Sequence, residues 1–148
     1  MSNQVRCLLL TLAFCGLAPA TSQAQRQYYD KSYSYNEINN YHFCKYHYKP
    51  TPAATTYSYH YVIYYPSRPR YIYYYNPVRR YYWGRVELDD KGESKGYSIL
   101  AEKDRKAKLE EIPETAFPKP AEMPAIPDAT DKEKIEKPNT KNLPKDKE

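Results

Sequence analysis

Apolar and polar side chains alternate in several short runs in the first half of this 148-residue chain. The clearest runs are Tyr57–Tyr61 (YSYHY) and Tyr71–Tyr75 (YIYYY), and Tyr33–Tyr35 and Tyr46–Tyr48 are fragments of the same pattern. Successive side chains of a strand point to opposite faces of a sheet, and aromatic residues favour strands. Prolines at positions 50, 52, 66, 69 and 77 interrupt the runs. The pattern therefore predicts short strands joined by turns.

A hairpin is predicted further along the chain. Tyr81–Leu88 has the composition of a strand and contains the only tryptophan, Asp89–Ser94 has the composition of a turn, and Gly96–Leu100 can return as the second strand. An isolated hairpin is marginally stable in water, so we expect other parts of the chain to cover it.

The segment Ala101–Ile112 (AEKDRKAKLEEI) consists of good helix formers and ends before Pro113. We therefore expect one short helix there, packed through Leu109 and Ile112. The proline-rich stretch that follows should be extended and lie across the core through Phe117, Met123 and Ile126. Residues 128–148 alternate bases and acids with few apolar side chains, which predicts a disordered charged tail.

The N-terminus has the layout of a secretory signal peptide. Arg6 precedes the apolar run Cys7–Leu17, and small residues follow it. Cleavage is expected after Ala24, with Ala20 as the second choice. The run is shorter than the roughly 20 residues that cross a bilayer, and no later run is long enough. We expect an exported protein, periplasmic or extracellular, without a transmembrane segment after signal removal.

These observations predict a small β-rich (α+β) unit with short strands, one hairpin and one short helix. The chain then divides into a signal peptide (1–24), a tyrosine-rich basic segment of short strands and turns (25–80), a unit of hairpin, helix and proline-rich extension (81–127) and a disordered charged tail (128–148).

Tyrosine and charge are both concentrated in the first half of the mature chain. Eighteen of the nineteen tyrosines lie between Tyr28 and Tyr82. Residues 25–86 carry nine Lys or Arg against two acids, a net of +7, whereas residues 87–148 carry thirteen against sixteen, a net of −3. Tyrosine combines a large apolar ring with a hydroxyl group, which suits contact surfaces. The composition favours a tyrosine-rich contact surface with a basic character.

Guanidinium groups interleaved with aromatic rings can bind a polyanion. Phosphate, carboxylate and sulfate pair with arginine, and rings stack on bases or on sugar faces. Export argues against nucleic acid and favours an anionic glycan. The candidate ligand-binding residues are Arg68, Arg70, Arg79, Arg80, Arg85, Tyr73, Tyr75, Tyr82 and Trp83.

A second candidate site gathers all three histidines and the only cysteine that remains after signal removal. His42, Cys44, His47 and His60 are residue types that bind zinc or copper, although their spacing matches no standard zinc module. Cys44 can alternatively be buried or form an intermolecular disulfide.

No catalytic constellation or cofactor motif is found in the sequence, and no cofactor is expected. We therefore expect a non-enzymatic exported protein with a structural or interaction role at the cell envelope or matrix. Its partner is an unidentified envelope or matrix component, with self-association through strand edges as a further possibility. Binding of an anionic glycan or other polyanion and metal binding are the alternatives.

Four stretches of the second half form a recognisable series: Trp83–Arg85, Lys95–Arg105, Ile112–Pro118 and Met123–Pro127. The series resembles small exported, tyrosine-rich proteins of unknown function from planctomycete bacteria, over about Tyr71–Asp131. The resemblance implies a bacterial exported protein and carries no activity, ligand or catalytic residue.

Overall fold

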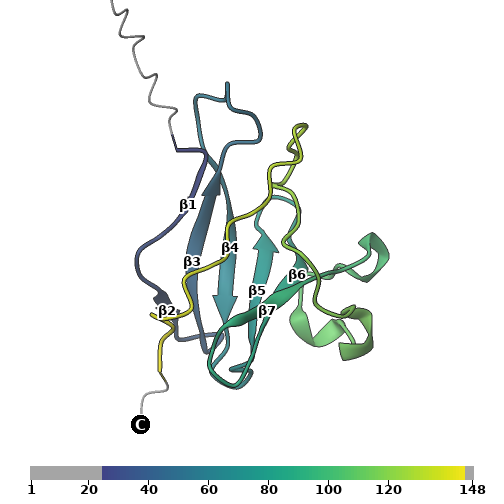
Figure 1. Ribbon diagram of the computed structural model, residues 1–148. Helices are drawn as coiled ribbons and strands as arrows, with labels where there is room; N and C mark the ends of the chain where they lie inside the picture. The colour runs from purple at the N-terminus through teal and green to yellow at the C-terminus, as the bar shows by residue number, and fades with distance from the viewer. Residues whose placement is uncertain (1–24, 146–148) are drawn as a thin grey trace, which may run out of the picture.

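The computed structural model describes residues 25–145, and within them seven strands form one curled antiparallel sheet (Figure 1). The predicted signal peptide lies outside the described residues, as do the last three residues of the predicted tail. No helix in the described part is both long enough and apolar enough to cross a bilayer. The strands are β1 (Gln27–Tyr29), β2 (Ser34–Asn36), β3 (Tyr41–Tyr48), β4 (Ser58–Tyr64), β5 (Tyr71–Asn76), β6 (Tyr81–Leu88) and β7 (Ser94–Ile99).

Five strands, β3 to β7, follow one another across the sheet as a meander, and β1 and β2 share the outer edge of β3. Strand β1 pairs with Tyr46–Tyr48 and β2 with Tyr41–Phe43, so the two short strands together cover that edge. The predicted hairpin is confirmed as β6 and β7. Strands from both predicted segments, 25–80 and 81–127, belong to this single sheet.

Side chains of one parity along β3, β4 and β5 pack into a large cluster on one face of the sheet. We call this the tail-covered face, because Met123, Ile126 and Ile135 of the C-terminal segment complete it. The strands contribute the buried side chains of Cys44, Tyr46, Tyr48, Val62, Tyr64, Ile72, Tyr74, Trp83, Val86, Leu88 and Tyr97. Tyrosines thus supply much of the core.

A β-bulge in β6 places its aromatic residues on both faces. Tyr74 pairs with Gly84 and Tyr75 with Tyr82, which leaves Trp83 as the extra residue. Gly84 then lies under a neighbouring ring, since a Cβ built on it would come within 2.4 Å of the Tyr97 side chain. Glycine is required here because the ring of Tyr97 occupies the space of a side chain.

The opposite face, which we call the open face, is covered only in part. Ile63, Tyr73 and Tyr82 of the strands pack there against Leu100 and residues 109–117, including the buried Leu109, Ile112 and Phe117. In Figure 1 this covering segment is the green stretch beside β6 and β7.

The helix predicted over Ala101–Ile112 is wrong. That stretch forms only two single 3-10 turns, Glu102–Asp104 and Leu109–Glu111, separated by extended backbone, and a third turn follows at Glu114–Ala116. In a helix the Lys106 carbonyl would accept a bond from within the segment, but here it accepts one from the Tyr82 N–H at 2.9 Å. Tertiary contacts therefore override the helix propensity of these residues, because so short a helix is only marginally stable by itself.

Phe117, Met123 and Ile126 are buried, as the sequence predicted. Beyond them, residues 131–136 of the predicted disordered tail lie along the sheet and contact β1 through Gln27 and Tyr29. In Figure 1 this yellow segment passes in front of β3 and β4. Ile135 is 2% exposed, and the side-chain amide of Gln27 donates to the Lys134 carbonyl at 2.9 Å. This docked stretch is a feature that the predicted tail did not include.

Candidate functional site: the aromatic row of the open face

The part of the open face that the 101–117 segment leaves uncovered consists of aromatic rings. Residues of odd number along β3 and β4 point to this face, and Tyr28 of β1 and residues next to the strands join them. We call the following eight side chains the aromatic row: Tyr57, Tyr28, His47, Tyr59, Tyr61, Phe43, Tyr41 and Tyr65. Tyr57 and Tyr59 are exposed, and the other six are partly buried.

Consecutive rings of the aromatic row touch one another. Their centroids are 5.1, 4.5, 6.2, 5.5, 5.6, 6.1 and 5.3 Å apart in the order given above. Stacked, tilted and edge-to-face pairs of this spacing are attractive, so each ring restricts its neighbours. The row is therefore a pre-ordered aromatic surface and not a set of independent side chains.

Two lysines lie over rings of the row. The Lys45 ammonium is 4.5 Å from the centroid of Tyr59, and that of Lys49 is 4.7 Å from the centroid of Tyr57. Cations held over ring faces in this way are attracted by the negative π-face. The exposed end of the row is thus basic as well as aromatic, in agreement with the charge asymmetry of the sequence.

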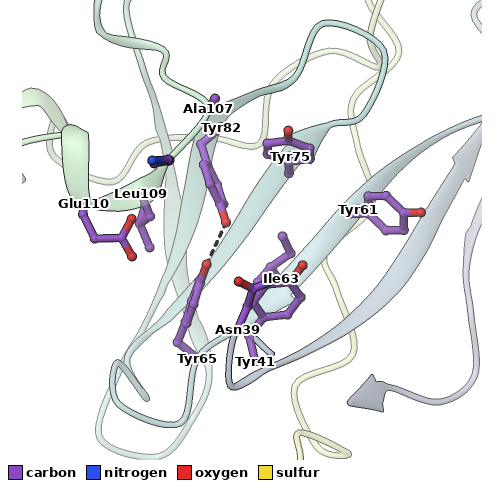
Figure 2. A pocket seen from close by; sticks show the side chains of 11 residues that line it. Asn39, Tyr41, Tyr61, Ile63, Tyr65, Tyr75, Tyr82, Ala107, Leu109 and Glu110 are labelled. Atoms are coloured by element: carbon purple, nitrogen blue, oxygen red, sulfur yellow. Dashed lines mark hydrogen bonds between the residues drawn. The ribbon is translucent and has the colours of Figure 1, made fainter. Parts of the chain in front are cut away.

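At its other end the row meets the covering segment in a pocket of about 290 Å³, shown in Figure 2. Five tyrosines line it together with Ile63, Asn39 and residues 107–110; the tyrosines are Tyr41, Tyr61, Tyr65, Tyr75 and Tyr82. The hydroxyl groups of Tyr65 and Tyr82 form a hydrogen bond of 2.7 Å across it. Burial raises the pKa of both hydroxyls, so both stay protonated and one donates to the other.

The arginines predicted as ligand residues are not gathered at one place. Arg68 and Arg85 both pair with Glu114, at 3.3 and 2.8 Å, and Arg70 pairs with Asp90. The Arg85 side chain is buried, with its guanidinium 3.7 Å from the ring centroid of Tyr71 and 3.8 Å from that of Phe117. These three arginines hold the covering segment and a turn in place.

Arg79 and Arg80 are exposed in the turn between β5 and β6. Of the predicted aromatic ligand residues, Tyr73, Tyr82 and Trp83 are buried and only Tyr75 is half-exposed. Tyr73, Tyr75 and Tyr82 belong to the open face, whereas Trp83 belongs to the tail-covered face. The predicted set is therefore divided between the two faces of the sheet and the turn at its end.

The predicted metal ligands do not converge. Cys44 and His47 are an odd number of residues apart in β3 and point to opposite faces. His47 bonds to Asp30 at 2.8 Å, while His60 is buried in contact with Tyr48. Among residues 25–145 there is no group of three or more His, Cys, Asp or Glu side chains that could hold a metal ion. Cys44 is a free, buried thiol whose pKa is raised by burial to about 12.

Sequence reasoning missed most of the aromatic row, although it noted the alternation that produces it. The odd positions 41, 43, 57, 59, 61 and 65 and the pairing residue 28 all carry aromatic rings. Pairing the runs in register would have placed these rings on one face. No family model, curated protein or solved structure matches this chain, so the aromatic row must be interpreted from its own chemistry.

Proposed function

We propose that the protein is a non-enzymatic interaction protein that acts outside the cytoplasm and binds envelope or matrix material through the aromatic row. The observation that carries the proposal is the row itself: eight rings in continuous contact, none of them fully buried, on a face whose other half is covered. Rings of this kind can stack on the apolar faces of sugars or against other rings. A soluble domain seldom leaves so large an aromatic patch uncovered without a partner.

The sheet edges are poor sites for the alternative of self-association through strands. One edge is covered by β1 and β2, which have three residues each. At the other edge, Tyr97 exchanges two backbone hydrogen bonds with Ala121, at 2.8 and 2.9 Å. Short and covered edges resist edge-to-edge pairing. Association between copies would therefore use the aromatic row more readily than the strand edges.

Cosedimentation with the washed, insoluble envelope fraction of the source organism tests the proposal. The Tyr57→Ser/Tyr59→Ser double variant should lose most of the binding, since both side chains are exposed parts of the row. Tyr35→Ser is the matched control, because Tyr35 is 42% exposed and lies outside the row. Sedimentation velocity at high protein concentration detects self-association in the same samples. A protein that is monomeric and binds no envelope fraction contradicts the proposal, as does equal loss in the control.

A further inference from the structure

A second pocket lies on the other side of the sheet, between the start of β6 and the C-terminal segment. It encloses about 480 Å³, a size suited to one or two sugar units. Trp83, Tyr81 and Ile99 form one wall, and residues 124–129 form another. The remaining lining residues are polar or charged: His60, Asn76, Arg79, Glu102, Arg105 and Asp128.

Two ring nitrogens at the wall of this pocket have no hydrogen-bond partner. They are Nε1 of Trp83, which is 6% exposed, and Nδ1 of His60, which is 5% exposed. The other ring nitrogen of His60 bonds to the Tyr48 hydroxyl at 3.2 Å. Buried polar groups are normally paired, because an unpaired one costs free energy. Two of the six such atoms found among residues 25–145 belong to side chains that line this pocket, which favours a polar ligand there.

The two arginines of the pocket differ in how they are held. Arg105 is positioned by bonds from its side chain to the Leu100 carbonyl and the Tyr81 hydroxyl, at 3.2 and 3.4 Å. Arg79 is exposed and makes no side-chain hydrogen bond or ion pair within the described residues. A guanidinium without a carboxylate partner, beside one that is already oriented, can pair with an anionic group of a ligand.

Other lining side chains can form hydrogen bonds with the hydroxyl groups of a ligand. Asn76 uses its side-chain oxygen to accept from the backbone N–H groups of Val78 and Arg79, at 3.0 and 3.1 Å, which leaves its NH₂ group to donate elsewhere. Glu102 and Asp128 supply exposed carboxylates that can accept from hydroxyls. Aromatic walls, a free guanidinium and acceptors for hydroxyls together fit an acidic sugar better than a simple inorganic anion, because an inorganic anion would leave the aromatic walls and the hydroxyl acceptors unused.

We propose that this pocket binds a carboxylated sugar unit, a hexuronic acid, with its carboxylate on Arg79 and its ring against Trp83 or Tyr81. The site is independent of the aromatic row, since it uses different residues on the tail-covered side of the sheet. Failure of one proposal therefore leaves the other standing.

Trp83 is the only tryptophan in the chain, so intrinsic fluorescence reports on the pocket without a label. The experiment is a titration of the mature protein with digalacturonate, and with a neutral galactose disaccharide as the comparison ligand. We expect a saturable change with digalacturonate, a much weaker one with the neutral sugar, and loss of affinity as salt is added. Arg79→Gln should weaken binding about tenfold, as expected for one charged hydrogen bond.

Arg80→Gln is the matched control, because Arg80 is the exposed neighbour of Arg79 and does not line the pocket. Its affinity should stay within about twofold of wild type. Three results would overturn the proposal: no saturable change up to millimolar digalacturonate, equal affinity for the neutral disaccharide, or equal weakening by the two arginine variants. Circular dichroism of each variant verifies that the fold is retained.

Discussion

The two faces of the sheet use the same residue type for opposite purposes. On the tail-covered face, Tyr46, Tyr74 and Tyr97 are at most 2% exposed and pack against the C-terminal segment. On the open face, Tyr57 and Tyr59 are 36% and 37% exposed and rest mainly on other rings. Tyrosine content alone therefore says little about where a binding surface lies. Whether a position is even or odd along its strand decides which face its ring occupies. The segments that pack on that face then decide whether the ring is buried or accessible.

The largest expected difference in stability is between two variants that each remove one ring, one from each face of the sheet. Tyr74 is fully buried, contacts the rings of Trp83 and Tyr97, and shares a hydrogen bond of 2.8 Å with the Tyr29 hydroxyl. Tyr74→Ala should lower the free energy of unfolding by about 3–5 kcal/mol, as for other buried aromatic truncations. Tyr59→Ala should lower it by only about 0.5 kcal/mol.

Urea denaturation followed by circular dichroism measures both values. Comparable losses in the two variants would break the distinction between the faces, because they would mean that the aromatic row is also a core.

The second effect is a pH dependence of stability, which tests whether water is excluded from the tail-covered face. Burial lowers the pKa of His60 from 6.5 to about 4. Between these values the unfolded chain binds a proton that the folded protein does not, so the free energy of unfolding should fall as the pH decreases from about 6.5 to about 4. The full loss corresponds to about 3 kcal/mol.

Denaturation curves measured at several pH values across that window, for wild type and His60→Gln, test this prediction. The variant should lack this part of the pH dependence. If the free energy of unfolding of His60→Gln changed with pH as steeply as that of wild type, another group would be responsible and His60 would be hydrated.

The smallest effect concerns the β-bulge at Trp83, which places Tyr82 and Trp83 on opposite faces of the sheet. Gly84→Ala places a methyl group against the buried ring of Tyr97, which is 2% exposed and has little room to move. We expect a loss of about 1–3 kcal/mol in the free energy of unfolding, the usual cost of overpacking. The double variant Gly84→Ala/Tyr97→Leu should show a favourable coupling energy relative to the sum of the single changes. Strict additivity would show that the two positions do not compete for the same space.

Much of the sheet could be predicted from the alternation of aromatic residues. The runs at Tyr57–Tyr61 and Tyr71–Tyr75 became β4 and β5, and the hairpin at Tyr81 became β6 and β7. The fragments Tyr33–Tyr35 and Tyr46–Tyr48 fall at β2 and at the end of β3. These predictions succeeded because a period of two is a local property of the chain.

What could not be predicted depends on contacts between distant residues. The helix expected at Ala101–Ile112 does not form, and the Lys106 carbonyl instead accepts a hydrogen bond from the backbone N–H of Tyr82, 24 residues away. Ile135 has no apolar neighbours in sequence, so its burial under the sheet is visible only once the sheet exists. Likewise, the candidate arginines looked alike in sequence. Within residues 25–145, Arg85 and Arg68 pair with Glu114, whereas Arg79 has no such partner.

The most direct measurement of the central claim is oxidative footprinting of individual tyrosines, with and without the insoluble envelope fraction. In the free protein, Tyr35, Tyr57 and Tyr59 should be modified readily, and Tyr46 and Tyr74 should not. Binding should protect Tyr57 and Tyr59 and leave Tyr35 unchanged, since only the first two belong to the aromatic row. Equal protection of all three exposed tyrosines, or protection of none, would contradict the assignment of the open face as the binding surface.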